Sequence, residues 1–249
     1  MDTEISLRDL VAAYPYAVPI LEEAGIDYCC HGQTSLAQAC AEKKLDPKQL
    51  LRGVTEAKST APNDDMARLA KISLQELCDH IVHRHHGFTR QVGQEIGRLM
   101  PKVRQVHGSH HPELAEIEGL FQRLQQDLLT HMDQEERLVF PYISRLESLA
   151  RGDVPSAPPT YLGAAPISTM IADHDAAGAL MAEMHRLGGG FAPPSDACAS
   201  FRRLYEQLTA LERDLHWHVY LENNILFPRA QELEEKAAGG HRAPVRATA

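Results

Sequence analysis

The sequence predicts an all-α protein in which a small helical N-terminal domain precedes a four-helix bundle. Apolar residues recur at helical spacing through most of the 249 residues, and the sustained alternation of β-branched residues that marks strands is missing. Four of the helical patterns are long and amphipathic. Helices of that kind bury their apolar stripes against one another, so together they predict a bundle.

The first block of the sequence ends near residue 57. We expect short helices at 6–13, 17–24, 35–44 and 47–57. Ser35 followed by Gln38 has the spacing of a capping box at the start of the third of these helices. The stretch KSTAPNDDM that follows is typical of a linker, which we place at 58–69.

The second block, residues 70–234, holds the four long helical patterns of the predicted bundle. They cover residues 70–106, 112–147, 166–187 and 196–234. Segments rich in Pro and Gly separate the second pattern from the third and the third from the fourth. Residues 235–249 are predicted to form a flexible tail.

The second and fourth long patterns repeat one another. HMDQEERLVFP begins at His131 and HVYLENNILFP begins at His218, 87 residues later. Both stretches contain His-x-x-x-Glu and end in Phe-Pro, so the bundle is predicted to consist of two copies of a helix pair. We expect the proline to end or kink each helix.

Five ionisable residues of the bundle occupy positions where the apolar stripe should face the interior. They are His131, Glu135, His174, His218 and Glu222. A buried unpaired carboxylate costs roughly several kcal/mol, and two facing carboxylates repel each other. A bound cation reverses both effects. Because residues at i and i+4 share a helix face, each His-x-x-x-Glu can direct two ligands at one point, and the pattern predicts a metal site.

A sixth ligand is expected from the first long helix, which contains His80, His83, His85 and His86. The apolar stripe of this helix favours His85. The internal repeat favours His86, which precedes His174 by a similar offset. The pattern alone leaves both residues open.

The ligand types favour a di-iron centre. Imidazole and carboxylate ligation suits iron, manganese or zinc, whereas a structural zinc site favours thiolates in one closed tetrahedron. Two bridging carboxylates and two histidines per metal suit two iron ions, with an oxo or hydroxo bridge and an open position on each for a small ligand. Glu136, Asp173 and Asp175 are candidates for supporting the ligands.

Composition excludes several classes of function. The formal net charge of −9 and the pI of about 5.8 argue against a general nucleic-acid or anionic-membrane binder. No apolar run approaches the roughly 20 residues of a membrane span, and the N-terminus lacks a secretory signal pattern. The five cysteines are odd in number and scattered, which favours a reducing, cytoplasmic location. The sequence leaves open whether the chain forms a homodimer.

The motifs together resemble a known family. They are D-H-I-x-x-R-x-H at 79–86, H-x-x-x-E-E at 131–136, D-H-D-x-A-G at 173–178 and H-x-x-x-E-N-N-x-L-F-P at 218–228. The bundle resembles a hemerythrin-like domain, and the whole chain resembles the repair-of-iron-centres (RIC) family of bacterial di-iron proteins. The resemblance implies six metal ligands: His86, His131, Glu135, His174, His218 and Glu222. It thereby favours His86 over His85.

The resemblance extends to the N-terminal block through Asp27-Tyr28-Cys29-Cys30. It makes Cys29 and Cys30 candidates for a redox or iron-transfer role. Their position just before an expected helix start predicts lowered thiol pKa values.

The function that the resemblance implies is repair of, or iron supply to, iron–sulfur clusters damaged by nitrosative or oxidative stress. The expected partners are damaged or apo iron–sulfur proteins, with nitric oxide or oxygen as small ligands. Two alternatives are a di-iron nitric oxide reductase and a protein that senses oxygen or nitric oxide. No catalytic residue is assigned. Simple oxygen transport is disfavoured, because oxygen-carrying hemerythrins usually have five histidine ligands and we count four.

Overall fold

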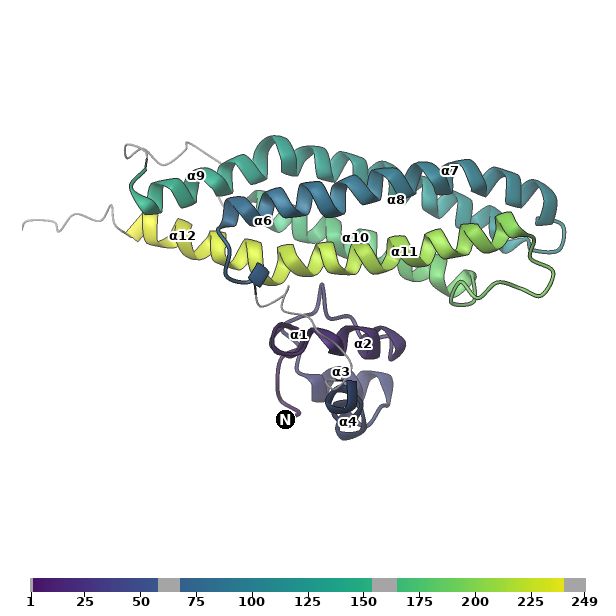
Figure 1. Cartoon of the computed structure of the whole chain (residues 1–249), viewed down its shortest axis with the longest axis horizontal. Helices are drawn as coiled ribbons and strands as arrows, with labels where there is room; N and C mark the ends of the chain where they lie inside the picture. The colour runs from purple at the N-terminus through teal and green to yellow at the C-terminus, as the bar shows by residue number, and fades with distance from the viewer. Residues whose placement is uncertain (1, 58–67, 154–164, 240–249) are drawn as a thin grey trace, which may run out of the picture. The chain divides into compact units, whose positions relative to one another are not determined.

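The computed structural model describes residues 2–57, 68–153 and 165–239, and most of them are helical (Figure 1). No strand occurs within these ranges; the one β contact is an isolated bridge between Ser6 and Ser35. This confirms the predicted all-α class. No helix in the described part of the chain is long and apolar enough to cross a membrane.

The N-terminal block contains four short α-helices and one 3-10 turn. They are α1 (Leu7–Ala13), η1 (Pro15–Ala17), α2 (Val18–Glu23), α3 (Leu36–Lys43) and α4 (Pro47–Ala57). Ser35 accepts a hydrogen bond from the backbone N–H of Gln38 and so caps α3, as its spacing predicted. The core of this block is aliphatic, and Leu10, Leu21 and Val54 are fully buried in it.

The four long patterns form continuous helices, three of which contain a turn of π-helix. The first comprises α6 (Leu74–Ile81), η2 (Val82–His86) and α7 (Gly87–His107); the second comprises α8 (Glu113–Gln134), η3 (Glu135–Val139) and α9 (Phe140–Arg151). The third is α10 (Ala165–Leu187), and the fourth comprises α11 (Ala199–Leu221), η4 (Glu222–Leu226) and α12 (Phe227–Gly239). The last helix passes residue 234, because the EEKAA stretch that follows is itself rich in helix formers.

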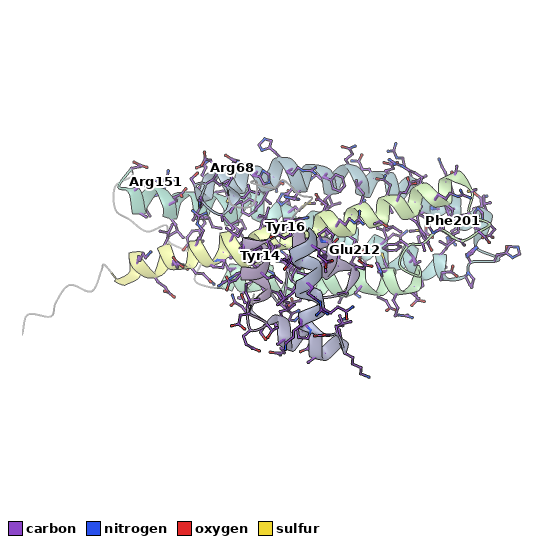
Figure 2. The ribbon with its side chains drawn as sticks, turned by 60° about the horizontal axis from the view of Figure 1, so that its bottom comes forward. Tyr14, Tyr16, Arg68, Arg151, Phe201 and Glu212 are labelled. Atoms are coloured by element: carbon purple, nitrogen blue, oxygen red, sulfur yellow. The ribbon has the colours of Figure 1, made fainter. Side chains whose placement is uncertain are left out.

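The chain divides into two compact units. One contains residues 79–139 and 163–219, and in it α8 packs against both α7 and α10. The helix α11 joins them through two ion pairs, from Arg203 to Glu95 on α7 and from Glu212 to His185 on α10. Phe201, near the start of α11, is labelled in Figure 2. Its ring contacts those of His107 and His111.

The other unit contains residues 1–78, 140–162 and 220–249. Within it α9 packs against α12. The buried carboxylate of Glu147 on α9 accepts hydrogen bonds from the first backbone N–H groups of α6, at Leu74 and Gln75. Arg229 on α12 donates to the carbonyl of Ile72. The predicted linker 58–69 falls mostly outside the described residues, as does most of the predicted tail.

Candidate metal site

Three turns of π-helix interrupt the long helices. η2 ends at His86, η3 begins at Glu135, and η4 begins at Glu222. π-Helical turns are rare and occur frequently at functional sites. η3 and η4 lie 87 residues apart, so the internal repeat extends to the backbone conformation.

The repeated proline does not end the helix, which was one of its two expected effects. Pro141 and Pro228 are each the second residue of the helix that follows a π-turn, and the helices continue as α9 and α12. Proline lacks an N–H, and its ring clashes with the carbonyl four residues earlier in a regular α-helix. A wider turn before the proline relieves that clash. The repeated Phe-Pro was therefore a signal for a π-turn.

Four buried histidines form two close pairs. Nε2 of His86 lies 3.3 Å from Nε2 of His218, and Nε2 of His131 lies 2.9 Å from Nε2 of His174. None of the four is more than 4% exposed. Each pair joins two different helices, so the bundle fold brings these residues together.

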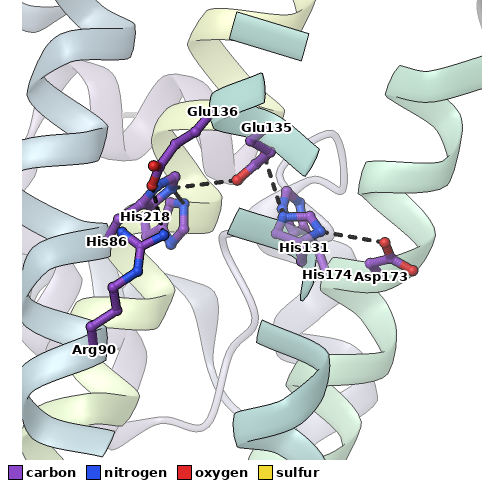
Figure 3. A network of polar contacts seen from close by, with 8 residues as sticks. All are labelled: His86, Arg90, His131, Glu135, Glu136, Asp173, His174 and His218. Carbon is purple, nitrogen blue, oxygen red and sulfur yellow. Dashed lines mark hydrogen bonds and ion pairs between the residues drawn. The ribbon is translucent and has the colours of Figure 1, made fainter. Parts of the chain in front are cut away.

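The carboxylate of Glu135 lies between the two pairs (Figure 3). Its Oε2 is 3.4 Å from Nε2 of His86, and its Oε1 is 3.2 Å from Nε2 of His131. Glu135 is completely buried. The carboxylate thus directs one oxygen toward each histidine pair.

The six residues predicted as ligands form two groups that could each hold a metal ion. One group is His86, Glu135, His218 and Glu222, and the other is His131, Glu135, His174 and Glu222. The potential ligand atoms of each group lie within 4.8 Å of one another. Both groups include the same two glutamates, as expected for bridging carboxylates.

His85, the alternative to His86, lies outside both groups. Its Nδ1 is 3.1 Å from Oδ1 of the buried Asp214, and its ring stacks on that of His218 with centroids 5.8 Å apart. The stripe favoured His85 because it assumed 3.6 residues per turn throughout. The π-turn η2 adds a residue to one turn and shifts the following positions, which brings His86 toward the glutamates instead.

Two carboxylates contact the Nδ1 atoms of His86 and His131, whose Nε2 atoms face Glu135. Nδ1 of His86 lies 2.8 Å from Glu136, which Arg90 also contacts at 2.8 Å, and Nδ1 of His131 lies 3.3 Å from Asp173. Burial alone would raise the pKa of Glu136, but hydrogen bonds from His86 and Arg90 hold that pKa below its ordinary value. Asp175, the third predicted supporting residue, is exposed.

This arrangement fits a bound cation. An ionised carboxylate only accepts hydrogen bonds, so the Nδ1 atoms of His86 and His131 donate to Glu136 and Asp173. In the neutral rings the Nε2 lone pairs of His86 and His131 then point at the buried carboxylate of Glu135, which is also electron-rich. A metal ion with nitrogen and oxygen ligands turns this repulsion into coordination, and a carboxylate behind each ligating histidine is typical of such sites.

The two candidate cysteines lie in the loop between α2 and α3. Cys29 is buried and Cys30 is half-buried. The expectation of a lowered pKa is wrong for Cys29, because its contact with Cys30 and its burial raise the pKa of its thiol well above the ordinary value. The helix start at Leu36 is too far along the chain to lower it.

Comparison with known proteins identifies the parts of the chain. The hemerythrin HHE cation binding domain matches residues 77–230 and again 166–247, the second match covering the second half of the repeat. The ScdA N-terminal domain, a domain of unknown function, matches residues 3–58.

Relatives match nearly the whole chain. The iron-sulfur cluster repair protein ScdA of Staphylococcus haemolyticus is 31% identical over 90% of this chain and 96% of its own length. The iron-sulfur cluster repair protein YtfE of Musicola paradisiaca is 32% identical over 91% of this chain and 96% of its own length. The chain therefore belongs to the family of the ScdA and YtfE proteins, and its bundle belongs to the hemerythrin HHE cation-binding family.

Proposed function

We propose that this protein is a di-iron protein that repairs, or supplies iron to, iron–sulfur clusters damaged by nitrosative or oxidative stress. The proposed ligands are those of the two groups above: His86, His131, Glu135, His174, His218 and Glu222. Two relatives that match nearly the whole chain are named iron-sulfur cluster repair proteins, which supports the repair function. The clients are damaged or apo iron–sulfur proteins, and the place of action is the cytoplasm, where free cysteines such as its five persist.

The observation that carries the proposal is the position of Glu135 between two histidine pairs. A single metal ion would need only one of those pairs. A carboxylate with one oxygen toward each pair is suited to two ions held side by side. Iron is favoured over zinc because the six ligands are imidazoles and carboxylates and include no thiolate.

The same ligand set suits a donor of iron. Ferrous iron held by imidazole and carboxylate exchanges more readily than iron in a cage of thiolates. In this function the transferred ion is the cargo. The protein's own residues bind it, hold it away from bulk solvent through their burial, and orient the histidines through Glu136 and Asp173.

Two measurements test this function. Metal analysis of the purified protein should give two irons per chain, and one zinc per chain would overturn the di-iron assignment. Under anaerobic, reducing conditions with added sulfide, the iron-loaded protein should restore the visible spectrum of an apo ferredoxin. Restoration should persist when a chelator that binds free ferrous iron is present. Failure to restore the cluster in the presence of the chelator would overturn direct supply.

Nitric oxide reduction is a second candidate, because two metal ions sharing Glu135 and Glu222 could each bind one molecule. The reaction consumes two nitric oxide molecules, two electrons and two protons, and gives nitrous oxide and water. An external electron donor must supply the electrons for repeated turnover. Nitrous oxide that stops at one equivalent per chain, despite excess donor, would exclude a catalytic role.

A further inference from the structure

The loop between α2 and α3 places four metal-ligating side chains next to one another. Oδ1 of Asp27 accepts hydrogen bonds from the backbone N–H groups of Cys29 and Cys30, at 3.0 and 2.9 Å. This turn brings the two thiols together, with their Sγ atoms 3.9 Å apart. Oδ1 of Asp27 also lies 3.2 Å from Sγ of Cys29.

The cluster is held in place yet open on one side. His31 contacts Oδ2 of Asp27 through Nδ1, at 2.7 Å, and its own side chain is 69% exposed. Cys29 is buried while Cys30 is half-buried. Ligand atoms of Asp27, Cys29 and Cys30 all lie within 4.8 Å of one another. The half-buried thiol of Cys30 therefore lies between the buried thiol of Cys29 and solvent-exposed groups of the loop.

We propose that Asp27, Cys29 and Cys30 form a second metal site that takes one thiophilic divalent cation, with the exposed His31 beside it. Two thiolates and a carboxylate favour ferrous iron, zinc or cobalt over magnesium or calcium. That the ion is ferrous iron, received on its way from the bundle to a client, rests on the iron supply proposed above.

The loop is fixed to the segment that carries one of the proposed bundle ligands. Nδ2 of Asn224 donates to the carbonyl of Cys29 at 2.9 Å, and Asn224 is two residues beyond Glu222 in η4. Gly32 packs so closely on Asn224 that an added Cβ would overlap the Oδ1 atom of Asn224. The second site is therefore joined to Glu222 by one hydrogen bond and two residues of helix.

The binding step balances without any redox partner. Cys29 and Cys30 exchange their thiol protons for the metal ion, and up to two protons go to the buffer. The ion keeps its charge and no electron moves.

Cobalt(II) added to the reduced, iron-loaded, full-length protein under anaerobic conditions tests the site. Thiolate ligation gives an intense near-ultraviolet charge-transfer band that imidazole and carboxylate ligation does not give. We expect this band to saturate at one cobalt per chain. The C29S/C30S double variant should lose it, and the D27N variant, whose amide oxygen preserves the turn, should bind cobalt about tenfold more weakly.

The C198S variant is the matched control, because Cys198 is exposed and lies outside the cluster; it should keep the full band. No band in the reduced wild-type protein, or a band that survives in C29S/C30S, would overturn the second site. A disulfide between Cys29 and Cys30 that persists in reductant, detected by thiol titration, would also overturn it.

The role in iron transfer is measured separately. Iron loss from the bundle to apo ferredoxin should be about tenfold slower in C29S/C30S than in C198S. Equal rates would overturn the transfer role while the cobalt band still established the site. No transfer by any variant, including the wild type, would instead refute the proposed function and leave the cobalt result standing.

Discussion

The two copies of the repeat have the same backbone conformation but differ in their contacts with the N-terminal block. Each copy has a histidine, a glutamate one turn later that begins a π-turn, and a proline after it. The copies diverge at the positions between and after the ligands. In the first copy Asp133, Arg137 and Leu138 are partly or largely exposed, and in the second copy two of the equivalent residues contact the N-terminal block.

Three pairs of equivalent residues show the difference. Asp133 and Arg137 form an exposed ion pair in the first copy, whereas their equivalents Tyr220 and Asn224 bond to the backbone carbonyls of Arg8 and Cys29. Leu138 is 56% exposed, whereas its equivalent, Ile225, is 7% exposed. The second copy thus packs against the N-terminal block at positions where the first copy is exposed.

The largest expected effect on metal binding comes from Glu135, whose equivalent in the other copy is Glu222. Glu135→Gln keeps the side-chain shape and removes a charge that faces both histidine pairs. We expect binding of each iron to weaken by more than about 100-fold, beyond the effect of losing a supporting residue. Metal content after dialysis against a fixed free iron concentration measures this.

The same substitution should have the opposite effect on the metal-free protein, which it should stabilise. Without a cation, Glu135 and Glu222 are close and buried, and they repel each other when both are ionised, so Glu135→Gln should raise the Tm of the metal-free protein. If the variant instead lowered that Tm and retained both irons, Glu135 would be a structural residue.

The next effect concerns what the copies do not share. Tyr220→Ala removes a completely buried ring that packs on Tyr28 and donates to the carbonyl of Arg8. We expect a loss of about 3–5 kcal/mol in the free energy of unfolding, as for other buried aromatics. The equivalent substitution Asp133→Ala should cost less than about 0.5 kcal/mol. Equal losses in urea denaturation would refute the asymmetry between the copies.

The sequence predicted the helices and the clustered residues because both depend on periodicity. Apolar stripes located every long helix, and ionisable residues on those stripes located five of the six clustered side chains. The same argument failed at His86, because a π-turn changes the period locally and the first helix has no Phe-Pro to announce it. Periodicity assumes a constant turn, so it cannot detect the place where the turn changes.

The contact between the N-terminal loop and the second copy could not be predicted from the sequence either. Asn224 has a small polar side chain and Gly32 has none, so neither adds to a periodic apolar pattern. Their contact joins segments about 190 residues apart in the sequence. The thiol pKa of Cys29 likewise depends on burial and on its neighbour. Such properties follow from tertiary packing rather than from local pattern.

A smaller effect should separate the supporting residues of the first copy. Glu136→Ala removes the carboxylate that holds Nδ1 of His86, so iron affinity should fall about 10- to 100-fold. The control is Arg137→Ala, an adjacent residue whose side chain is 75% exposed, and it should leave the affinity unchanged. Competition with a chelator of known affinity measures both, and similar values for the two variants would show that Glu136 does not support the ligand.

The smallest effect tests the contact between the N-terminal loop and the second copy. Gly32→Ala places a Cβ against the amide of Asn224, which must turn away from the carbonyl of Cys29. We expect a loss of about 1 kcal/mol in unfolding free energy. Asn224→Ala loses the same hydrogen bond but makes room for the Cβ, so the double variant should be no less stable than Asn224→Ala alone. Gly119→Ala, where nothing lies within 4 Å of the added Cβ, should be neutral or stabilising. Additive losses from Gly32→Ala and Asn224→Ala would mean that the two residues do not touch in solution. That result would refute the contact between the N-terminal loop and the second copy.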